Sequence, residues 1–398
     1  MMRLRHILVM MVFVLASGMG VTARAHPGVN TSAVVTVKRD GAVVVQVHHD
    51  ALAFALNDIS QRIEDEPMNE LLDGPPEDLA LALHEGRERF QTLMRMEADG
   101  APVALRLKDG PTPDKVRDWL AAGRTPRIPV KLDFLTEGLI PREAKTLVLF
   151  FPEILSDVVV TVERPGEEPI SLVAFGGQAS PAVPIDLSAA SSPPTVHEDA
   201  DQKDDAKEHA QPRVLNPMGF ILLGFEHILP DGLDHILFVL GLFLLNAKLK
   251  PLLIQITCFT LAHSVTLALA AGGWVHVPGA IVEPVIAASI AFIAIENLFT
   301  TKVHPWRPAL IFVFGLIHGL GFAGAFQESI GAERIPLGPV LLFNVGVELG
   351  QLAVVGIAFA LVGWALNKTW YRKGIAIPAS LAIAAAGLWW TVERTLLA

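Results

Sequence analysis

The chain has 398 residues, a single cysteine and an uneven distribution of charge. Residues 1–25 carry three arginines and no acid, residues 26–213 carry 19 Lys/Arg and 32 Asp/Glu, and residues 214–398 carry nine of each. The apolar last part excludes a soluble single-domain enzyme, and the acidic middle part excludes a nucleic-acid binder. The lone Cys258 excludes an intramolecular disulfide and a cysteine-based zinc or iron–sulfur site.

The first 25 residues are typical of a secretory signal peptide. A basic start is followed by the apolar stretch 7–16 and by a small-x-small cleavage site at Ala23-Arg24-Ala25. The alternative is an uncleaved anchor helix. Cleavage after Ala25 would place His26 at the mature N-terminus and would export residues 26–213, in a bacterium to the periplasm.

Residues 26–180 predict a small β-rich α+β domain in the periplasm. Strands at 33–39 and 42–48 alternate apolar and polar residues around Asp40-Gly41, a strong hairpin signal. Further strands are expected at 102–107, 128–135, 145–151 and 157–163, and a helix is expected at 76–97 with Leu79, Leu83, Phe90, Leu93 and Met94 on its apolar side. Residues 181–213 are rich in Pro, Ser, Ala and acid, which predicts a linker because such a segment cannot bury a core.

From residue 214 onward the apolar runs are long enough to cross a bilayer, which takes about 20 residues. Six crossings are predicted, at 216–246, 252–271, 281–299, 308–327, 337–365 and 375–396. The first is interrupted at Pro230-Asp231-Gly232, so residues 216–228 are either half of one broken crossing or a re-entrant half-helix. The loop lysines and arginines favour six net crossings with both ends outside, since most of them then lie in inner loops. The predicted fold class is therefore mixed: a β-rich α+β periplasmic domain followed by an all-α polytopic membrane domain of about six transmembrane helices (residues 214–398).

Ionisable side chains inside these apolar segments are candidates for function, because a charge at the bilayer centre costs about 2.5–3.5 kcal/mol on insertion scales. The metal-ligand candidates are His227, Asp234, His235, His263, His318 and Glu348, with Glu226, Asp231, Asn344 and His26 as additional ones. Imidazoles and carboxylates at similar depth suit Ni²⁺, Co²⁺, Zn²⁺ or Mn²⁺, whereas Cu⁺ prefers sulfur ligands. The alternative is that the polar groups join helices by hydrogen bonds of about 0.6 kcal/mol each, which accounts for Asn344 better than for several histidines.

A second metal site is conceivable in the exported domain. The free α-amine and imidazole of His26 could chelate a metal, and His48-His49 could complete the site. The alternative is that these histidines are simply exposed.

A short repeat relates two of the predicted crossings. Phe259-Thr260-Leu261-Ala262-His263 is similar to Phe314-Gly315-Leu316-Ile317-His318, and each is followed by a helix with an internal carboxylate, Glu296 or Glu348. Transporters often contain repeated helical units with the substrate site at the interface between them. Glycines at positions 315 and 319 would allow neighbouring backbones to approach closely.

Several of these motifs together resemble one family of membrane proteins. The segments Gly224-Phe225-Glu226-His227, Asp231-Gly232-Leu233-Asp234-His235, Phe259 to Ser264, Phe314 to Gly319 and Phe343 to Gln351 look like the HupE/UreJ family. The resemblance covers about residues 215–365 and does not extend to the exported domain.

The resemblance implies uptake of nickel or cobalt, accessory to hydrogenase and urease maturation, with His227, Asp234 and His235 as the leading metal-handling residues. Nickel members tend to have His-Pro where this chain has His227-Ile228. Because of this departure, the resemblance implies a divalent metal ion in general more firmly than nickel in particular.

Three functions are compatible with the sequence. The first is a divalent-metal permease of the bacterial inner membrane, with no tightly bound cofactor, Ni²⁺ or Co²⁺ as cargo, and room for a homo-oligomer or a periplasmic metal-delivery partner. It has no P-loop motif, so its energy would come from ion gradients, the membrane potential or a partner. The second is an intramembrane metal-dependent hydrolase, in which several histidines, an aspartate and Ser264 would hold zinc and activate water, although no Gly-x-Ser-x-Gly or His-Glu-x-x-His motif is present. The third is a membrane-anchored periplasmic binding or sensor protein.

Overall fold

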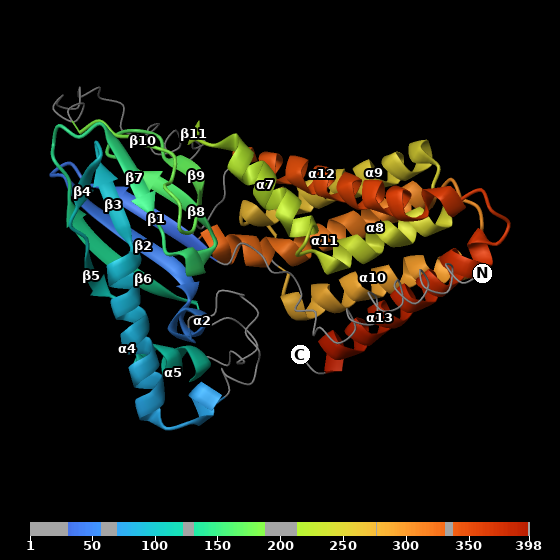
Figure 1. Ribbon diagram of the computed structural model, residues 1–398, viewed down its shortest axis with the longest axis horizontal. Coiled ribbons are helices and arrows are strands. Elements are labelled where there is room, and N and C mark those ends of the chain that lie inside the picture. The colour runs from blue at the N-terminus through green and yellow to red at the C-terminus, as the bar shows by residue number, and fades with distance from the viewer. Residues whose placement is uncertain are drawn as a thin grey trace.

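The computed structural model describes residues 31–56, 70–121, 131–187, 213–275, 277–330 and 337–396. Two parts follow each other along the chain, a domain of β-sheets and a bundle of helices that lies beside it (Figure 1). The predicted signal peptide, His26 and most of the predicted linker lie outside the described residues.

Two sheets form the N-terminal domain, the larger in the order β11-β9-β8-β1-β2-β6-β5 and the smaller in the order β10-β7-β3-β4. The strands are β1 (Thr31–Val37), β2 (Ala42–Asp50), β3 (Arg95–Ala98), β4 (Ala101–Val103), β5 (Arg106–Asp109), β6 (Lys131–Leu139), β7 (Thr146–Phe150), β8 (Asp157–Glu163), β9 (Ile170–Phe175), β10 (Val183–Pro184) and β11 (Arg213–Val214). The predicted hairpin is confirmed, because β1 and β2 pair antiparallel and Gly41 between them has a φ of 88°, which glycine adopts readily. The parallel pairing of β1 with β8 then brings residues far apart in the chain side by side.

Short helices cover this domain, namely α2 (Ala51–Leu56), α4 (Pro76–Leu93), α5 (Pro113–Ala121) and the 3₁₀ turn η1 (Glu153–Leu155). Leu79, Leu83 and Phe90 of α4 are buried as predicted. Leu93 is instead 44% exposed, and the helix ends there rather than at the predicted residue 97. The ring of Phe90 stacks on Phe134 of β6 at a centroid distance of 4.4 Å, which fixes the helix on the large sheet.

Ordered structure of the N-terminal domain continues beyond residue 180. Strand β10 pairs with β7, and the side chains of Ile185 and Leu187 are buried in the same core. On the far side of the undescribed segment, β11 pairs parallel with β9 just before the first membrane helix. The chain therefore returns to the large sheet immediately before it enters the helical part.

The helical part consists of α7 (Pro217–Ile228), α8 (Leu233–Leu245), α9 (Leu249–Ala271), α10 (Gly279–Phe299), α11 (Arg307–Ile330), α12 (Leu337–Val362), η3 (Gly363–Ala365), η4 (Arg372–Ala376) and α13 (Ile377–Leu396). Among the described residues four spans, in α9, α10, α12 and α13, are long and apolar enough to cross a membrane, and α7 with α8 makes a fifth that is bent by 70°. The remaining predicted crossing, at 308–327, lies in α11, of which Arg307–Gly321 forms a shorter apolar stretch. The protein is thus a multi-pass membrane protein, and six is an approximate number of crossings.

The long helices pack as three close pairs, α7 with α12, α9 with α11 and α10 with α13, while α8 contacts members of all three pairs. Each pair has a glycine against the backbone of its partner. A Cβ added at Gly224 would lie 1.9 Å from the Phe343 carbonyl oxygen, one at Gly319 2.4 Å from that of His263, and one at Gly387 2.7 Å from the Ala291 nitrogen. The predicted close approach at Gly319 is confirmed, and the two repeated motifs lie against each other.

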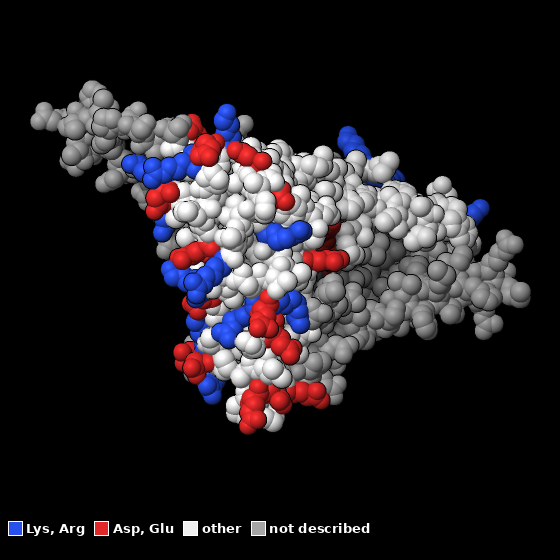
Figure 2. All heavy atoms as spheres, turned by 60° about the vertical axis from the view of Figure 1, so that its left-hand side comes forward, with Lys and Arg blue, Asp and Glu red and all other residues white. Residues whose placement is uncertain are grey.

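Charge separates the two parts of the molecule. Figure 2 shows Lys, Arg, Asp and Glu side chains spread over the N-terminal domain, whereas few lie over the described helices. Large apolar side chains such as Leu261, Phe292 and Ile357 are exposed on those helices, as expected for a surface that faces lipid. The turns after α8, α10 and α12, which carry the basic loop residues, lie at the end of the bundle away from the sheets (Figure 1).

Asn216 joins the start of the first membrane helix to the large sheet. The Asn216 amide accepts a hydrogen bond from the Val173 nitrogen at 2.9 Å and donates one to the Val173 carbonyl oxygen at 2.9 Å. Asn216 directly precedes α7, so both hydrogen-bonding groups of this β9 residue are tied to the start of that helix.

Candidate metal site

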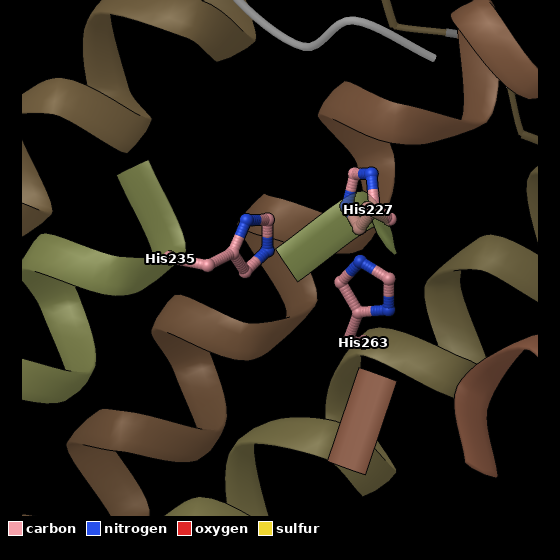
Figure 3. A group of neighbouring side chains, drawn as sticks. All are labelled: His227, His235 and His263. Atoms are coloured by element: carbon pink, nitrogen blue, oxygen red, sulfur yellow. The ribbon is translucent and has the colours of Figure 1, made fainter. Parts of the chain in front are cut away.

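Three histidines from three helices converge inside the helical part (Figure 3). His227 of α7, His235 of α8 and His263 of α9 each offer a ring nitrogen, and these three atoms lie within 4.8 Å of one another. All three side chains are buried, with exposed fractions of 5%, 0% and 0%. Three imidazoles at this spacing can bind one transition-metal ion in common.

The break between α7 and α8 brings His227 and His235 together. Helix α7 ends at Ile228, and the chain turns back so closely that a Cβ on Gly232 would lie 2.2 Å from the His227 carbonyl oxygen. Only glycine fits there without moving the backbone. The two rings consequently lie 5.0 Å apart between centroids although their residues belong to different helices. Interrupted helices with this geometry are a recurring way to build transport sites.

The hydrogen bonds around His263 indicate which of its ring nitrogens carries the hydrogen. The Asn344 amide nitrogen donates to the Val340 carbonyl oxygen at 2.8 Å, which turns the amide oxygen toward the ring. That oxygen lies 3.0 Å from Nδ1 of His263, so Nδ1 carries the hydrogen. Nε2 of His263 therefore presents its lone pair, as a metal ligand requires.

A fourth buried histidine, His318 of α11, lies next to this group. Its ring centroid is 5.2 Å from that of His235. The Ser289 hydroxyl donates to the Ile286 carbonyl oxygen at 2.7 Å and lies 2.9 Å from Nε2 of His318, so it accepts the hydrogen of that nitrogen. Nδ1 of His318 is then the acceptor nitrogen. His318 does not belong to the three-residue group, but its ring lies beside that of His235.

The structure pairs Asp234 with an arginine that the sequence did not suggest. Arg394 of α13 donates to both carboxylate oxygens of Asp234, at 3.0 and 3.2 Å. Its guanidinium also lies over the Trp390 ring at 5.5 Å. The available signal was the presence of an arginine within the last predicted crossing, because a buried arginine needs an anionic partner.

Glu348 and Asn344 both face α9 from α12. The Thr257 hydroxyl donates to Oε1 of Glu348 at 2.8 Å, and the Thr260 hydroxyl donates to the Gln351 side-chain oxygen at 3.0 Å. Together with the His263–Asn344 contact, these bonds form a polar face between α9 and α12 that runs from His263 toward the start of α9.

Glu226 lies at the interface with the N-terminal domain. Its carboxyl group shares a hydrogen bond with that of Asp157, the first residue of β8, and interacts electrostatically with Asp231. Burial raises the pKa of Asp157 above its ordinary value. Three acids thus gather where α7 meets the large sheet, and one of them, Glu226, directly precedes His227 in the sequence.

Two further carboxylates of α10 lie outside the histidine group. Glu296 is 3.3 Å from Nη1 of Arg307, and that arginine side chain is fully buried. The main-chain oxygen of Glu283 accepts a hydrogen bond from Arg394 at 3.4 Å.

His48 and His49 lie on opposite sides of β2, because successive residues of a strand alternate. Nδ1 of His48 is 2.9 Å from Asp133 at the half-exposed face. His49 is buried on the core side, with Nδ1 2.7 Å from the Thr31 hydroxyl. The two rings do not meet, and His26, the third member of the predicted exported site, lies outside the described residues.

Comparison with known families agrees with this division of the chain. The model of one protein family, described as HupE / UreJ protein, matches residues 202–394. The membrane half of the chain belongs to the HupE/UreJ family. This is a transporter-type family of membrane proteins rather than an enzyme family, and the β-rich domain precedes the matched HupE/UreJ region. No match was found among curated proteins or among solved structures.

Proposed function

We propose that this protein is a permease for divalent transition-metal ions of the nickel and cobalt type, with the three-histidine group as its central binding site. The observation that carries the proposal is the meeting of His227, His235 and His263, buried and within 4.8 Å, in a HupE/UreJ helical domain. Buried histidines in a membrane bundle are otherwise expensive to maintain.

The chemistry of the donors supports Ni²⁺, Co²⁺ or Zn²⁺ as cargo. Imidazole nitrogen suits these ions, whereas Cu⁺ prefers thiolate or thioether ligands, and the three-residue group contains no sulfur. Three neutral ligands leave coordination positions open and add no negative charge. A site of this kind keeps positions open for water or for a further ligand along the route of the ion.

The surrounding acids suggest a route for the ion. Asp157, Glu226 and Asp231 would attract cations where the sheets meet the bundle. Beyond the histidines, Glu348 on the polar face between α9 and α12 would receive the ion on its way across. Asp234 and His318 complete the set, the first adjacent to His235 in sequence and the second beside its ring.

The membrane orientation that we propose places the N-terminal domain in the periplasm and the protein in the bacterial inner membrane. It rests on the basic residues at the opposite end of the bundle, such as Lys248, Lys302 and Lys368, which the positive-inside rule assigns to the cytoplasm. Transport is then inward from the periplasm.

The experiment is accumulation of Ni²⁺, Co²⁺ and Zn²⁺ by whole cells that lack their own importers and express this protein. We expect uptake of at least one ion, with His235→Ala reducing it to background at matched expression. The control is His84→Ala, since His84 is an exposed residue of α4 far from the bundle in sequence. No uptake by the native protein, or full uptake by the His235 variant, would contradict the proposal.

A further inference from the structure

The Asp234–Arg394 ion pair joins the start of α8 to the end of α13 inside the bundle. The two side chains are 5% and 6% exposed. Arg394 binds both carboxylate oxygens, so the charge of Asp234 is directed at α13. The three-histidine group correspondingly contains no carboxylate among the residues that the structure describes.

A second carboxylate lies close to the same guanidinium. Glu283 of α10 accepts a main-chain hydrogen bond from Arg394, and its carboxyl group interacts electrostatically with both Arg394 and Asp234. Arg394 therefore lies between two acids from different helices, bound to one and near the other.

Charge balance makes this arrangement relevant to the histidines. Three neutral imidazoles cannot compensate a divalent ion in the low-dielectric interior of a membrane protein, where uncompensated charge is costly. The acid next to His235 in the sequence is Asp234, and Arg394 already neutralises it. A buried ion pair of this kind adds little net stability compared with apolar side chains of the same volume, so its presence points to a role other than stability.

We propose that Arg394 is a positioning residue that competes with the transported cation for Asp234: it holds Asp234 when no cation is bound, and it moves to Glu283 when a divalent ion takes Asp234. This inference rests on the proposed permease function. Competition by an internal cation lowers the affinity of the site, and a transporter needs such limited affinity to release its cargo. The planar fork of arginine suits the exchange, because it can bind either carboxylate through two parallel hydrogen bonds.

The test is Ni²⁺ binding to the full-length protein in detergent, measured by calorimetry in a double-mutant cycle of Arg394→Gln and Asp234→Asn. We expect Arg394→Gln to bind Ni²⁺ on the order of tenfold more tightly, since loss of a charged hydrogen-bonding competitor has an effect of that size. In the Asp234→Asn background the same change should have little effect. An equal gain in both backgrounds would show only a through-space charge effect and would overturn the proposal, as would unchanged or weaker binding by Arg394→Gln.

A second variant covers the case in which Arg394→Gln fails to fold. Glu283→Gln leaves the Asp234–Arg394 pair intact but removes the negative charge that would receive the displaced arginine, so we expect Ni²⁺ binding to weaken several-fold. The matched control is Glu393→Gln, which removes one acid from the neighbouring position on α13 and should leave binding unchanged. Native affinity in Glu283→Gln would overturn the proposed exchange.

The same measurements separate this inference from the function on which it rests. Absence of Ni²⁺ binding by the native protein would overturn the proposed function and the competition with it. Native binding that is lost in His235→Ala, together with native affinity in both the Arg394 and the Glu283 variant, would overturn only the role of Arg394.

Discussion

Asn344 illustrates how much of the candidate metal site depends on residues that orient the ligands without belonging to the three-histidine group. Its amide is oriented by the Val340 carbonyl oxygen and in turn fixes the hydrogen of His263 on Nδ1. Partners of this kind set the direction and basicity of a ligand ring, and their loss typically weakens metal binding 10- to 100-fold.

The residue-scale prediction is that Asn344→Leu weakens Ni²⁺ binding about 10- to 100-fold while the protein stays folded, because leucine has a similar volume. Calorimetry on the purified protein measures it. Thr266→Val is the control, since the Thr266 hydroxyl donates only to carbonyl oxygens of its own helix, at 3.2 and 3.3 Å. Equal affinity of native protein and Asn344→Leu would refute the role given to the amide.

A second residue-scale prediction concerns Asp133 on the N-terminal domain. Partial burial opposes its ionisation, yet hydrogen bonds from His48 and Gln46 outweigh burial and hold the pKa of this carboxyl below its ordinary value. The folded state therefore favours the carboxylate. Its contribution to stability is complete above the ordinary pKa of about 3.9 and is lost as the pH falls through the lower folded value.

We expect Asp133→Asn to lower the thermal unfolding midpoint at neutral pH slightly and to make its decline between about pH 5 and pH 3 shallower than in the native protein. Thermal unfolding in detergent across this pH range is the measurement. Asp114→Asn, at an exposed acid of α5, should keep the native profile. A parallel shift of the whole profile in Asp133→Asn would argue against the pKa explanation.

At the scale of single residues the sequence identified the three histidines and missed how they are held. His227, His235 and His263 stood out because ionisable groups in apolar segments are rare. Arg394 could not be assigned to Asp234, since the two positions are 160 residues apart and rotation about each helix is free in a depth argument. The contact between Asp157 and Glu226 was likewise invisible, because it joins two domains.

The close helix pairs are the decisive feature at the scale of elements. Gly224 and Gly346 put the backbones of α7 and α12 in contact, and a Cβ at Gly346 would lie 1.9 Å from the Ile221 carbonyl oxygen. No side chain can move aside to relieve such a clash, because the obstacle is main chain. The position of His227 on α7 therefore depends on two glycines.

We predict that Gly346→Ala destabilises the folded protein by about 1–3 kcal/mol, as overpacking of a close interface does, and that it also weakens Ni²⁺ binding by displacing α7. Gly356→Ala on the same helix is the matched control, because a Cβ there meets nothing within 4 Å. Chemical or thermal unfolding and calorimetry give the two readouts. Equal stability of the two variants would show that the helices can separate without penalty.

Element prediction succeeded where periodicity or length was unambiguous. The apolar runs of α9, α10, α12 and α13 exceed the thickness of a bilayer, so their positions followed from hydropathy. Strand β9 was missed because both of its faces are covered and five of its six residues are buried. Such a strand lacks the alternation of apolar and polar residues that reveals a half-exposed strand. Strand β3 was missed because four residues, Arg95–Ala98, carry too little pattern.

At the scale of the whole molecule the proposed orientation gives a direct prediction. In a Cys258→Ser background, a cysteine at Asp40 in the β1–β2 turn should react with a membrane-impermeant thiol reagent in intact cells with a permeabilised outer membrane. A cysteine at Lys302, in the turn after α10, should react only after lysis. Lys368, after α12, provides a second position expected to be inside, and reversed labelling would contradict the proposed orientation.

The division of the chain was predictable from charge, because residues 26–213 have a net charge of −13 (19 − 32) and residues 214–398 have none (9 − 9). The way in which the two parts contact each other was not predictable from the sequence. It depends on the amide of Asn216 and on the carboxyl groups of Glu226 and Asp157, and none of these belongs to a recognisable motif.

The two hydrogen bonds between Asn216 and Val173 connect the first membrane helix directly to the large sheet. Helix α7 has 12 residues and is about 18 Å long at 1.5 Å per residue, with Val173 bound at its start and His227 in its last turn. Glu226, one residue before His227, also contacts Asp157 of β8, so α7 is joined to the large sheet near both of its ends. We therefore expect a displacement of the N-terminal domain to move α7, and with it the ring of His227 in the candidate site.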